Sequence, residues 1–196
     1  MNSRERILST VRKSEPNPVA LPLVTPPDPV GPLVETFCQS VERIGGQVIR
    51  VNDPTRIAAY VRETFVPDVD WVSAVDGLPG TLKLDETLER GHTLAGVELA
   101  ICEGHLGVAE NGAIWVTDDS LPHRALPFLC QYLGLFIAES ALVATMHDAY
   151  RLLDGRSFDY GVFIAGPSKT ADIEQSLVIG AHGPRSLTVF LLADLL

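Results

Sequence analysis

The chain has 196 residues, of which 46% are apolar and 20% are charged. These values are typical of a globular protein with one medium-sized domain and a substantial core. Its 25 acidic residues outnumber the 15 basic ones, which gives a formal net charge of −10. Such a charge repels nucleic-acid phosphates and anionic membrane surfaces, so neither is expected as a partner. An anionic ligand would need a local binding site.

We find no pattern in the sequence that is typical of export, of membrane insertion or of metal binding. Residues 1–6 are polar and charged, unlike a secretion signal, and the apolar runs 133–138 and 187–193 are far shorter than the ~20 residues of a membrane helix. The three cysteines are Cys38, Cys102 and Cys130. Their odd number and the lack of CxxC spacing argue against a disulfide framework, a zinc site or an iron–sulfur cluster. We therefore expect a cytoplasmic protein that carries no metal.

The first 32 residues differ from the rest. Apolar residues at helical spacing after Ser3, a candidate N-cap, predict a short amphipathic helix over residues 3–12. These apolar residues are Ile7, Leu8 and Val11. Half of the 14 prolines follow between residues 15 and 32, and proline favours an extended chain because it fixes φ and lacks an amide donor. We predict an arm over residues 1–32, which packs on the domain, reaches a neighbouring subunit or is mobile, and one domain over residues 33–196.

From residue 33 onward, helical patterns alternate with short β-rich runs. Helices are expected over 33–44, 54–64, 141–153 and 170–178, a helix or turn over 82–89, and strands over 47–51, 71–75, 133–137, 160–165 and 187–192. This alternation predicts an α/β fold with a mostly parallel sheet and helices on both faces. Two further β-rich runs, 97–102 and 113–117, flank a glycine-rich segment with Asn111-Gly112, a strong hairpin-turn dipeptide. We read them as an antiparallel hairpin insertion.

The turn after the strand 160–165 has the composition of an anion-binding site. Gly166-Pro167 leaves the strand, and Ser168, Lys169 and Thr170 lie at the predicted start of a helix, whose free amides and dipole attract anions. In open α/β sheets such a turn falls at the carboxyl ends of the strands, where ligands bind. The proposed ligand-binding residues here are Gly166, Ser168, Lys169, Thr170, Asp172 and Glu174. The alternative is a capped helix with two acids in its first turn.

Three other positions are candidates for chemistry. Glu110, beside Asn111-Gly112, could act as a base or nucleophile if its pKa were raised, or it could be an exposed turn residue. Arg124 could hold a carboxylate, or form a surface salt bridge. His182, with Gly183 in a glycine-rich loop before the last strand, could transfer protons, or its ring could bond the backbone. No spacing of histidines and acids supports a metal site.

Four stretches of the chain, taken together, resemble the LutC/YkgG family of LUD domains. They are residues 107–113, Arg124 with Pro127, residues 166–175, and residues 177–184, and the resemblance spans residues 97–192. It implies a fold similar to the NagB/RpiA/CoA-transferase group. It also implies a role in oxidising lactate to pyruvate with partner proteins that carry iron–sulfur clusters. This chain departs from the family where a histidine often begins the strand after Arg124, because the segment here contains Tyr132 instead.

The resemblance leaves more than one function open. In the first, the protein is an accessory subunit of an L-lactate oxidation system that binds a small anion or carboxylate. In the second, Glu110 of Glu-Asn-Gly acts like the similar glutamate of CoA transferases, and the chain is an enzyme in its own right. In the third, the chain is a structural interaction module. Bond-making roles would fall on Glu110 and His182, and ligand contacts would add Asn111, Arg124 and Gly183 to the turn residues. The cofactor is unknown, and the arm is compatible with a homo-oligomer.

Overall fold

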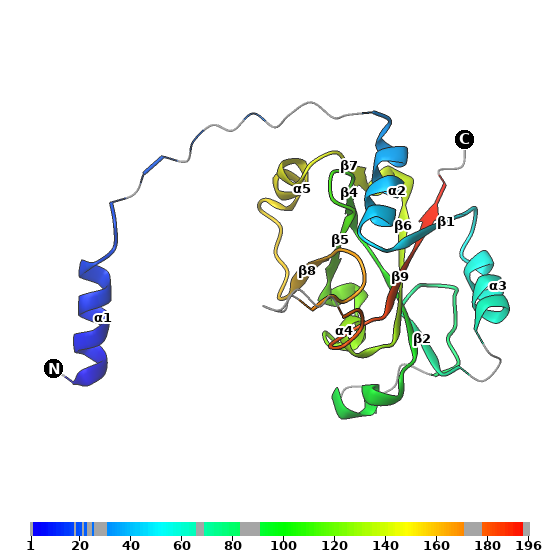
Figure 1. Ribbon diagram of the computed structural model, residues 1–196. Coiled ribbons are helices and arrows are strands. Elements are labelled where there is room, and N and C mark those ends of the chain that lie inside the picture. The colour runs from blue at the N-terminus through cyan, green and yellow to red at the C-terminus, as the bar shows by residue number, and fades with distance from the viewer. Residues whose placement is uncertain are drawn as a thin grey trace.

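A five-stranded parallel sheet forms the centre of the protein (Figure 1). The computed structural model describes residues 2–17, 19–20, 22, 25, 31–65, 69–82, 91–170 and 178–193. Over these residues the strand order of this main sheet is β1 (Gln47–Val51), β9 (Ser186–Leu192), β6 (Tyr132–Ala138), β3 (Leu99–Glu103) and β2 (Trp71–Ser73). Gln47 pairs with Thr188, and Tyr132 pairs with Ser186, so β9 lies between β1 and β6. The expected parallel sheet is confirmed.

A second, mixed sheet packs against the first. Its strand order is β7 (Leu142–Val143), β4 (Leu106–Val108), β5 (Ala113–Thr117) and β8 (Gly161–Ile164). β4 and β5 form an antiparallel hairpin around a turn at residues 109–112, β7 runs parallel to β4, and β8 runs antiparallel to β5. The expected hairpin is present, but its first strand is β4 and not the run 97–102. That run is β3, whose side chains are almost all buried, as is typical of a strand covered on both faces.

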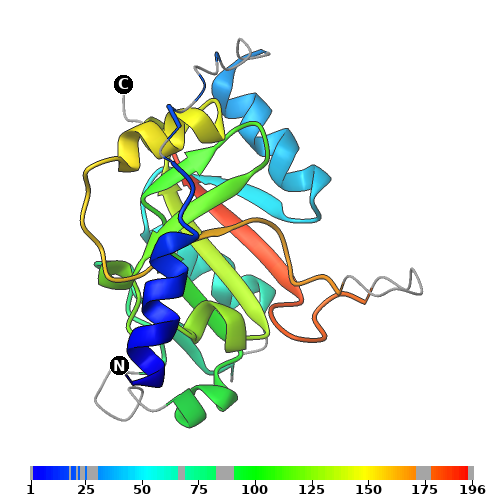
Figure 2. The same cartoon turned by 90° about the vertical axis from the view of Figure 1, so that its left-hand side faces the viewer.

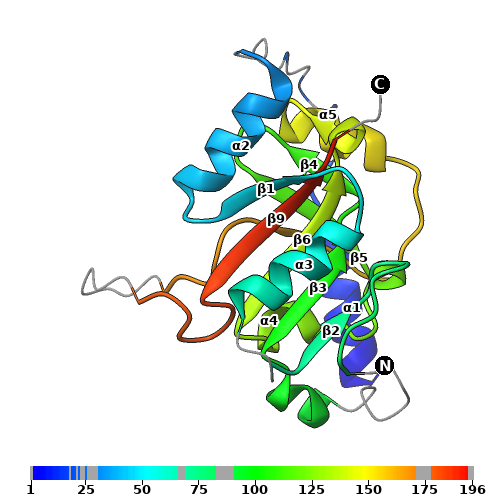
Figure 3. The same ribbon diagram turned by 90° about the vertical axis from the view of Figure 1, so that its right-hand side faces the viewer.

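The layers differ from the expected helices on both faces of one sheet. One face of the main sheet packs on α3 (Thr55–Thr64), as Figure 3 shows, through Ile57, Val61 and the sheet residues Ile101 and Phe190. The opposite face packs on the second sheet, together with α2 (Leu33–Arg43) and α4 (Leu126–Leu129). α5 (Met146–Leu153) covers the outer face of the second sheet. The second sheet therefore takes the place of part of one helical layer.

The helix expected over 141–153 begins later than its apolar pattern indicated. Leu142 and Val143 are β7, which pairs with β4, so α5 starts at Met146. Thr145 is its N-cap and forms a capping box with Asp148: each side chain accepts a hydrogen bond from the other residue's amide. Short 3₁₀ turns occupy η2 (Gly91–Gly96), η3 (Asp118–Ser120) and η4 (Glu139–Ala141).

A helix was expected to start at Thr170, but the hydrogen bonds at Thr170 and Val178, the described ends of the expected helix, are not those of a helix. The Thr170 amide donates to the carbonyl of Val178 (3.1 Å), and Lys169 forms an antiparallel bridge with Ile179. The described ends of this segment, Thr170 and Val178, are thus hydrogen-bonded to each other. The interior of this segment, and residues 83–89 of the expected helix or turn, lie outside the described residues.

The amino-terminal helix α1 (Ser3–Lys13) stands apart from the two sheets in Figure 1 and is seen in front of them in Figure 2, which views the protein from that side. Its N-cap is Asn2 and not Ser3, because Asn2 and Glu5 form a capping box. None of the residues of α1 is buried. Among the described residues, no helix is long and apolar enough to cross a membrane.

Candidate functional site

Two of the segments singled out in the sequence lie against each other. The Ser168 amide donates to the carbonyl of Pro184 (2.9 Å), and the Gly180 amide donates to the carbonyl of Ser168 (2.9 Å). A Cβ atom at Gly183 would lie 3.0 Å from the Ser168 Cβ, so the two loops touch where Gly183 has no side chain. Residues 166–170 and 180–184 therefore form one structural unit, which we call the paired loops.

The Asn111-Gly112 turn lies beside the start of the paired loops. Ile114 pairs with Ile164 in the antiparallel β5–β8 ladder, so Gly112 and Gly166 lie opposite each other two residues further on. Both have positive φ, +71° and +73°, and both approach α2 closely. A Cβ atom would lie 2.8 Å from the Val41 amide nitrogen at Gly112 and 2.8 Å from the Ile44 carbonyl oxygen at Gly166. α2 therefore holds the turn and the loops in place.

Lys169 caps the end of α2. Its Nζ donates to the carbonyl oxygen of Ile44 at 2.6 Å, at the negative end of the helix dipole. An ammonium group has three donors, so this bond leaves Lys169 two donors for an anion. The hydroxyl of Thr170, in contrast, bonds the backbone of Val178 across the bridge. Lys169 can therefore still donate to an anion, whereas the Thr170 hydroxyl is used in the hydrogen bonds that hold the loop together.

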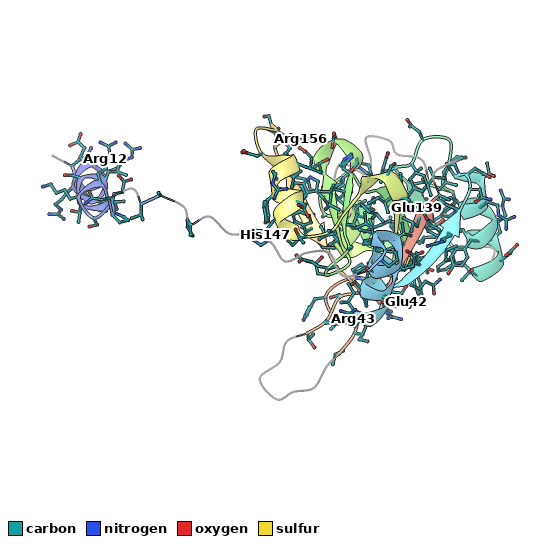
Figure 4. The ribbon with its side chains drawn as sticks, turned by 90° about the horizontal axis from the view of Figure 1, so that it is seen from above. Arg12, Glu42, Arg43, Glu139, His147 and Arg156 are labelled. Atoms are coloured by element: carbon teal, nitrogen blue, oxygen red, sulfur yellow. The ribbon has the colours of Figure 1, made fainter. Side chains whose placement is uncertain are left out.

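The paired loops lie at the amino-terminal edge of the main sheet. Ile44 and Gly45 directly precede β1, and the amide of Arg185, just before β9, donates to the carbonyl of Gln131, just before β6 (2.8 Å). The expectation of a site at the carboxyl ends of parallel strands is wrong, because β8 belongs to the second sheet and runs antiparallel to β5. Figure 4 shows Arg43, at the end of α2, beside this region.

A cavity of about 560 Å³ opens at the same edge. It is lined by Gly45, Gly46, Gln47, Tyr60, Thr64, Phe65, Val69, Glu98, Tyr132, Ser186, Leu187 and Thr188. Lys169 does not line the cavity, but its Nζ lies 3.9 Å from where a Cβ atom of the lining residue Gly45 would be. Tyr132 lines the wall. The ammonium group therefore lies next to one wall of the cavity.

Glu110 makes contacts that hold local structure. Its Oε1 accepts a hydrogen bond from the amide of Met146 (2.7 Å), the first residue of α5, and its own amide donates to the carbonyl of Ala144 (3.0 Å). Asn111 Oδ1 accepts from the amide of Ala113 (3.0 Å). These bonds link the hairpin turn to the start of α5, where a carboxylate favours the positive helix end. The Glu110 side chain is exposed.

Arg124 pairs with groups at one end of the second sheet. Its guanidinium donates to Asp118 (3.0 Å) and lies 5.4 Å above the ring of Tyr160. Asp118 and Tyr160 flank the Thr117–Gly161 end of the β5–β8 ladder, whereas Gly112 and Gly166 lie beyond its other end. α4, which follows Arg124, reaches the paired loops, because a Cβ atom at Gly183 would lie 3.6 Å from the carbonyl oxygen of Phe128. His182 is exposed in its loop, and the proposed residues Asp172 and Glu174 lie outside the described residues.

A larger cavity, of about 830 Å³, was missed by reasoning from the sequence. It lies over the outer side of the second sheet and is lined by His105, Leu106, Trp115, Thr117, Asp118, Asp119, Ser140, Ala141, Val143, Leu152, Leu153, Arg156, Ser157, Phe158 and Asp159. The hydroxyl of Thr117, above all, and nearby His105 hold the pKa of Asp119 below its usual value. These residues come from distant parts of the chain with no shared motif, so only the fold brings them together.

The cysteines and acidic residues form no metal centre in the part of the chain that the structure describes. No group of three or more histidine, cysteine, aspartate or glutamate residues is placed there to hold an ion. Burial raises the pKa of the Cys102 thiol, and it raises that of Cys130 to about 12. Both are therefore neutral core residues at physiological pH.

The comparisons with known proteins agree on one family. A model of the LUD domain matches residues 72–192, which include the Glu110 turn, Arg124 and the paired loops. Lactate utilization protein C of Anoxybacillus flavithermus is 27% identical over 163 residues, 83% of this chain and 70% of that protein. The protein of the same name from Shouchella clausii is 36% identical over 92 residues, 44% of this chain and only 40% of its own length.

A solved structure supports the fold. The crystal structure of a DUF162 family protein from Deinococcus radiodurans superposes with a TM-score of 0.58 at 17% identity, covering 82% of this chain and 96% of that one. The resemblance noted from the motifs is confirmed by the match over residues 72–192. The chain belongs to the LUD-domain family.

Proposed function

We propose that the protein is an accessory subunit of a system that oxidises lactate to pyruvate, acting with partner proteins that carry iron–sulfur clusters. The observation that carries this proposal is the alignment with Lactate utilization protein C over 83% of the chain. The partners follow from the family resemblance of the paired-loop and Glu110 segments. The role of the chain in such a system would be to bind a small carboxylate and present it.

We assign that carboxylate to the 560 Å³ cavity at the amino-terminal edge of the main sheet, which we call the amino-edge cavity. Lys169 would supply a charged donor from beside Gly45, and Tyr132 a hydroxyl on the wall. The Tyr60 hydroxyl accepts from Gln47 Nε2 (2.7 Å) and so keeps its own proton for a ligand. Glu98 also lines the cavity and would repel a second negative charge. A ligand with one carboxylate, such as lactate or pyruvate, therefore fits better than a polyanion.

A second candidate is an enzyme of the NagB/RpiA/CoA-transferase kind, in which Glu110 is the acyl acceptor. The exposed position of Glu110 at a turn favours this function. The hydrogen bond from the Met146 amide to its Oε1 favours the structural role instead, because that oxygen already has a partner. If this function held, the Glu110 carboxylate would attack the carbonyl of acyl-CoA to give a mixed anhydride and free CoA. The CoA thiolate would then attack the Glu110 carbonyl, which gives a glutamyl-CoA thioester on the protein and releases the acid. An unmodified Glu110 peptide in the mass spectrum excludes it.

Thermal unfolding with added ligands tests the carboxylate site. A ligand at 100 times its dissociation constant adds about 2.7 kcal/mol of stability, so lactate, pyruvate, phosphate, a nucleotide and CoA can be ranked by the shift in Tm. We expect lactate or pyruvate to give the largest shift. Lys169→Met, which keeps the alkyl chain, should remove the shift, and Arg124→Ala should retain it because Arg124 pairs with Asp118 and does not line the cavity. Equal shifts in wild type and Lys169→Met would refute the placement.

Association with partners is tested separately. The chain, expressed with an affinity tag in its native host grown on lactate, should co-purify with a protein that shows the visible absorption of iron–sulfur clusters. Unimpaired growth on lactate without this chain would overturn the proposed pathway in that organism.

A further inference from the structure

The helix α1 carries an apolar face that no described part of its own chain covers. Ile7 is 61% exposed and Val11 is 57% exposed, and Leu8 lies beside them on the same face because of the spacing of one and four residues. A helix of 11 residues is marginal in water on its own, even with the Asn2–Glu5 capping box. An amphipathic helix of this length gains stability by burying its apolar face against a partner surface.

The charge of α1 is opposite to that of the rest of the chain. Four basic residues and one acidic residue give the helix a net charge of +3. Since the whole chain has a charge of −10, the remaining residues sum to −13. Arg4 and Arg12 lie four residues before and after Leu8, so they flank the apolar face. The surface that receives α1 should be apolar in its centre and acidic at its rim.

The 830 Å³ cavity over the second sheet, which we call the groove, has both properties. Its apolar lining includes Leu152 and Phe158, which are 49% and 43% exposed, and the indole of Trp115 below them. Its rim carries Asp118, Asp119 and Asp159 against one basic residue, Arg156. Arg124 bonds Asp118 from beside the rim, so the three aspartates exceed the nearby arginines by one. The groove thus matches α1 in both polarity and charge.

We propose that α1 of one chain docks in the groove of a second copy, and that the two copies exchange arms. Figure 4 shows Arg12 on α1 well away from Arg156 beside the groove. The segment of 19 residues from 14 to 32 spans up to about 60 Å when extended, which is enough to reach a neighbouring molecule. The exchange is reciprocal, so two copies close into a symmetric dimer with no unfilled groove. This proposal is independent of the proposed function.

Another exposed apolar pair competes as a receptor for α1. Phe128 and Leu129 on α4 are also exposed. Neither is flanked by an acidic residue in sequence, since the stretch 120–138 contains no aspartate or glutamate. Charge complementarity therefore favours the groove.

A charge-swap experiment on the full chain tests the exchange. The helix variant is Arg4→Glu with Arg12→Glu, and the groove variant is Asp119→Lys with Asp159→Lys. Sedimentation equilibrium should give a dimer for the wild type, twice the 21.2 kDa of one chain, and a more than tenfold weaker association for each variant alone. An equimolar mixture of the two variants should restore the dimer, because each helix then meets a groove of opposite charge. Higher salt should weaken the wild-type dimer.

Matched controls keep net charge from explaining the result. Arg56→Glu with Arg62→Glu, and Glu42→Lys with Glu63→Lys, make the same changes in net charge at exposed positions outside α1 and the groove. Both controls should dimerise like the wild type. A monomeric wild type, or a mixture of the two variants that stays monomeric, overturns the proposal. A groove variant that dimerises normally overturns it too, because α1 would then dock elsewhere, for example on Phe128 and Leu129.

Discussion

Replacing Gly112 by alanine tests whether α2 rests directly on the Asn111-Gly112 turn. The positive φ of +71° should cost about 1–2 kcal/mol for an alanine, of which the stiffer unfolded chain returns about 0.4–1 kcal/mol. The new Cβ would also lie 2.8 Å from the backbone nitrogen of Val41. Val41 is fully buried, so α2 cannot move aside without disturbing the core, and such overpacking costs about 1–3 kcal/mol. We expect a total loss of about 2–4 kcal/mol.

Gly77 provides the matched control. Its φ is +75°, and no heavy atom of the described residues lies within 4 Å of the point where an alanine methyl group would stand. Gly77→Ala should therefore show the conformational cost alone, about 1 kcal/mol or less. Urea unfolding, followed by tryptophan fluorescence and by circular dichroism, gives both free energies of unfolding if the m values agree. A loss at Gly112 no larger than that at Gly77 would refute the close contact between the turn and α2.

Three further predictions concern single side chains. Glu110→Gln keeps an oxygen for the Met146 amide, so it should lower the free energy of unfolding in urea by less than about 0.5 kcal/mol. Glu110→Ala removes the acceptor and should lower it by about 1 kcal/mol. Equal losses in the two variants would show that the charge of Glu110 matters and not its hydrogen-bond acceptor. Burial raises the pKa of the Cys130 thiol to about 12, so at pH 8 this thiol should react with iodoacetamide only as fast as the chain unfolds. Faster labelling, followed by mass spectrometry, would contradict its burial. The pKa of Asp148 is lowered, chiefly by the Thr145 hydroxyl, so its contribution to stability is present above the unfolded pKa of about 3.9 and is lost as the pH falls. Asp148→Asn should therefore lower Tm at pH 7 but not near pH 2, and a constant deficit across this range would contradict the linkage.

Elements with one unambiguous pattern could be predicted from the sequence. The β6 run is apolar and short enough to read as a buried strand, and Gly45-Gly46 stops α2 where the pattern placed it. Leu142 and Val143 could not be assigned, because two apolar neighbours fit either a helix face or a strand. Their pairing with β4, a contact between distant segments, decides the question.

The segments of the candidate site could be singled out from the sequence, but not the edge of the sheet at which they lie. The paired loops stand out because their glycines and polar residues are unusual, and the family resemblance joined them to Glu110. Which sheet β8 belongs to, and therefore which edge receives Lys169, depends on pairing that no local pattern reports. The partners of Arg124, which are Asp118 and the ring of Tyr160, likewise follow from the β5–β8 pairing.

The position of β9 affects how this protein can be synthesised. β1 cannot pair with β9 until nearly the whole chain has been made, because Gln47 pairs with Thr188, 141 positions later in the chain. Until the ribosome has added β9, the edges of β1 and β6 that β9 will fill are unpaired, and exposed strand edges invite association with other chains. Such distant pairing also slows folding, because the chain must lose the entropy of closing a large loop before the paired strands stabilise it. A stalled or prematurely terminated chain would thus lack the strand that joins β1 to β6, and its unpaired edges would be exposed to the cell's chaperones and proteases.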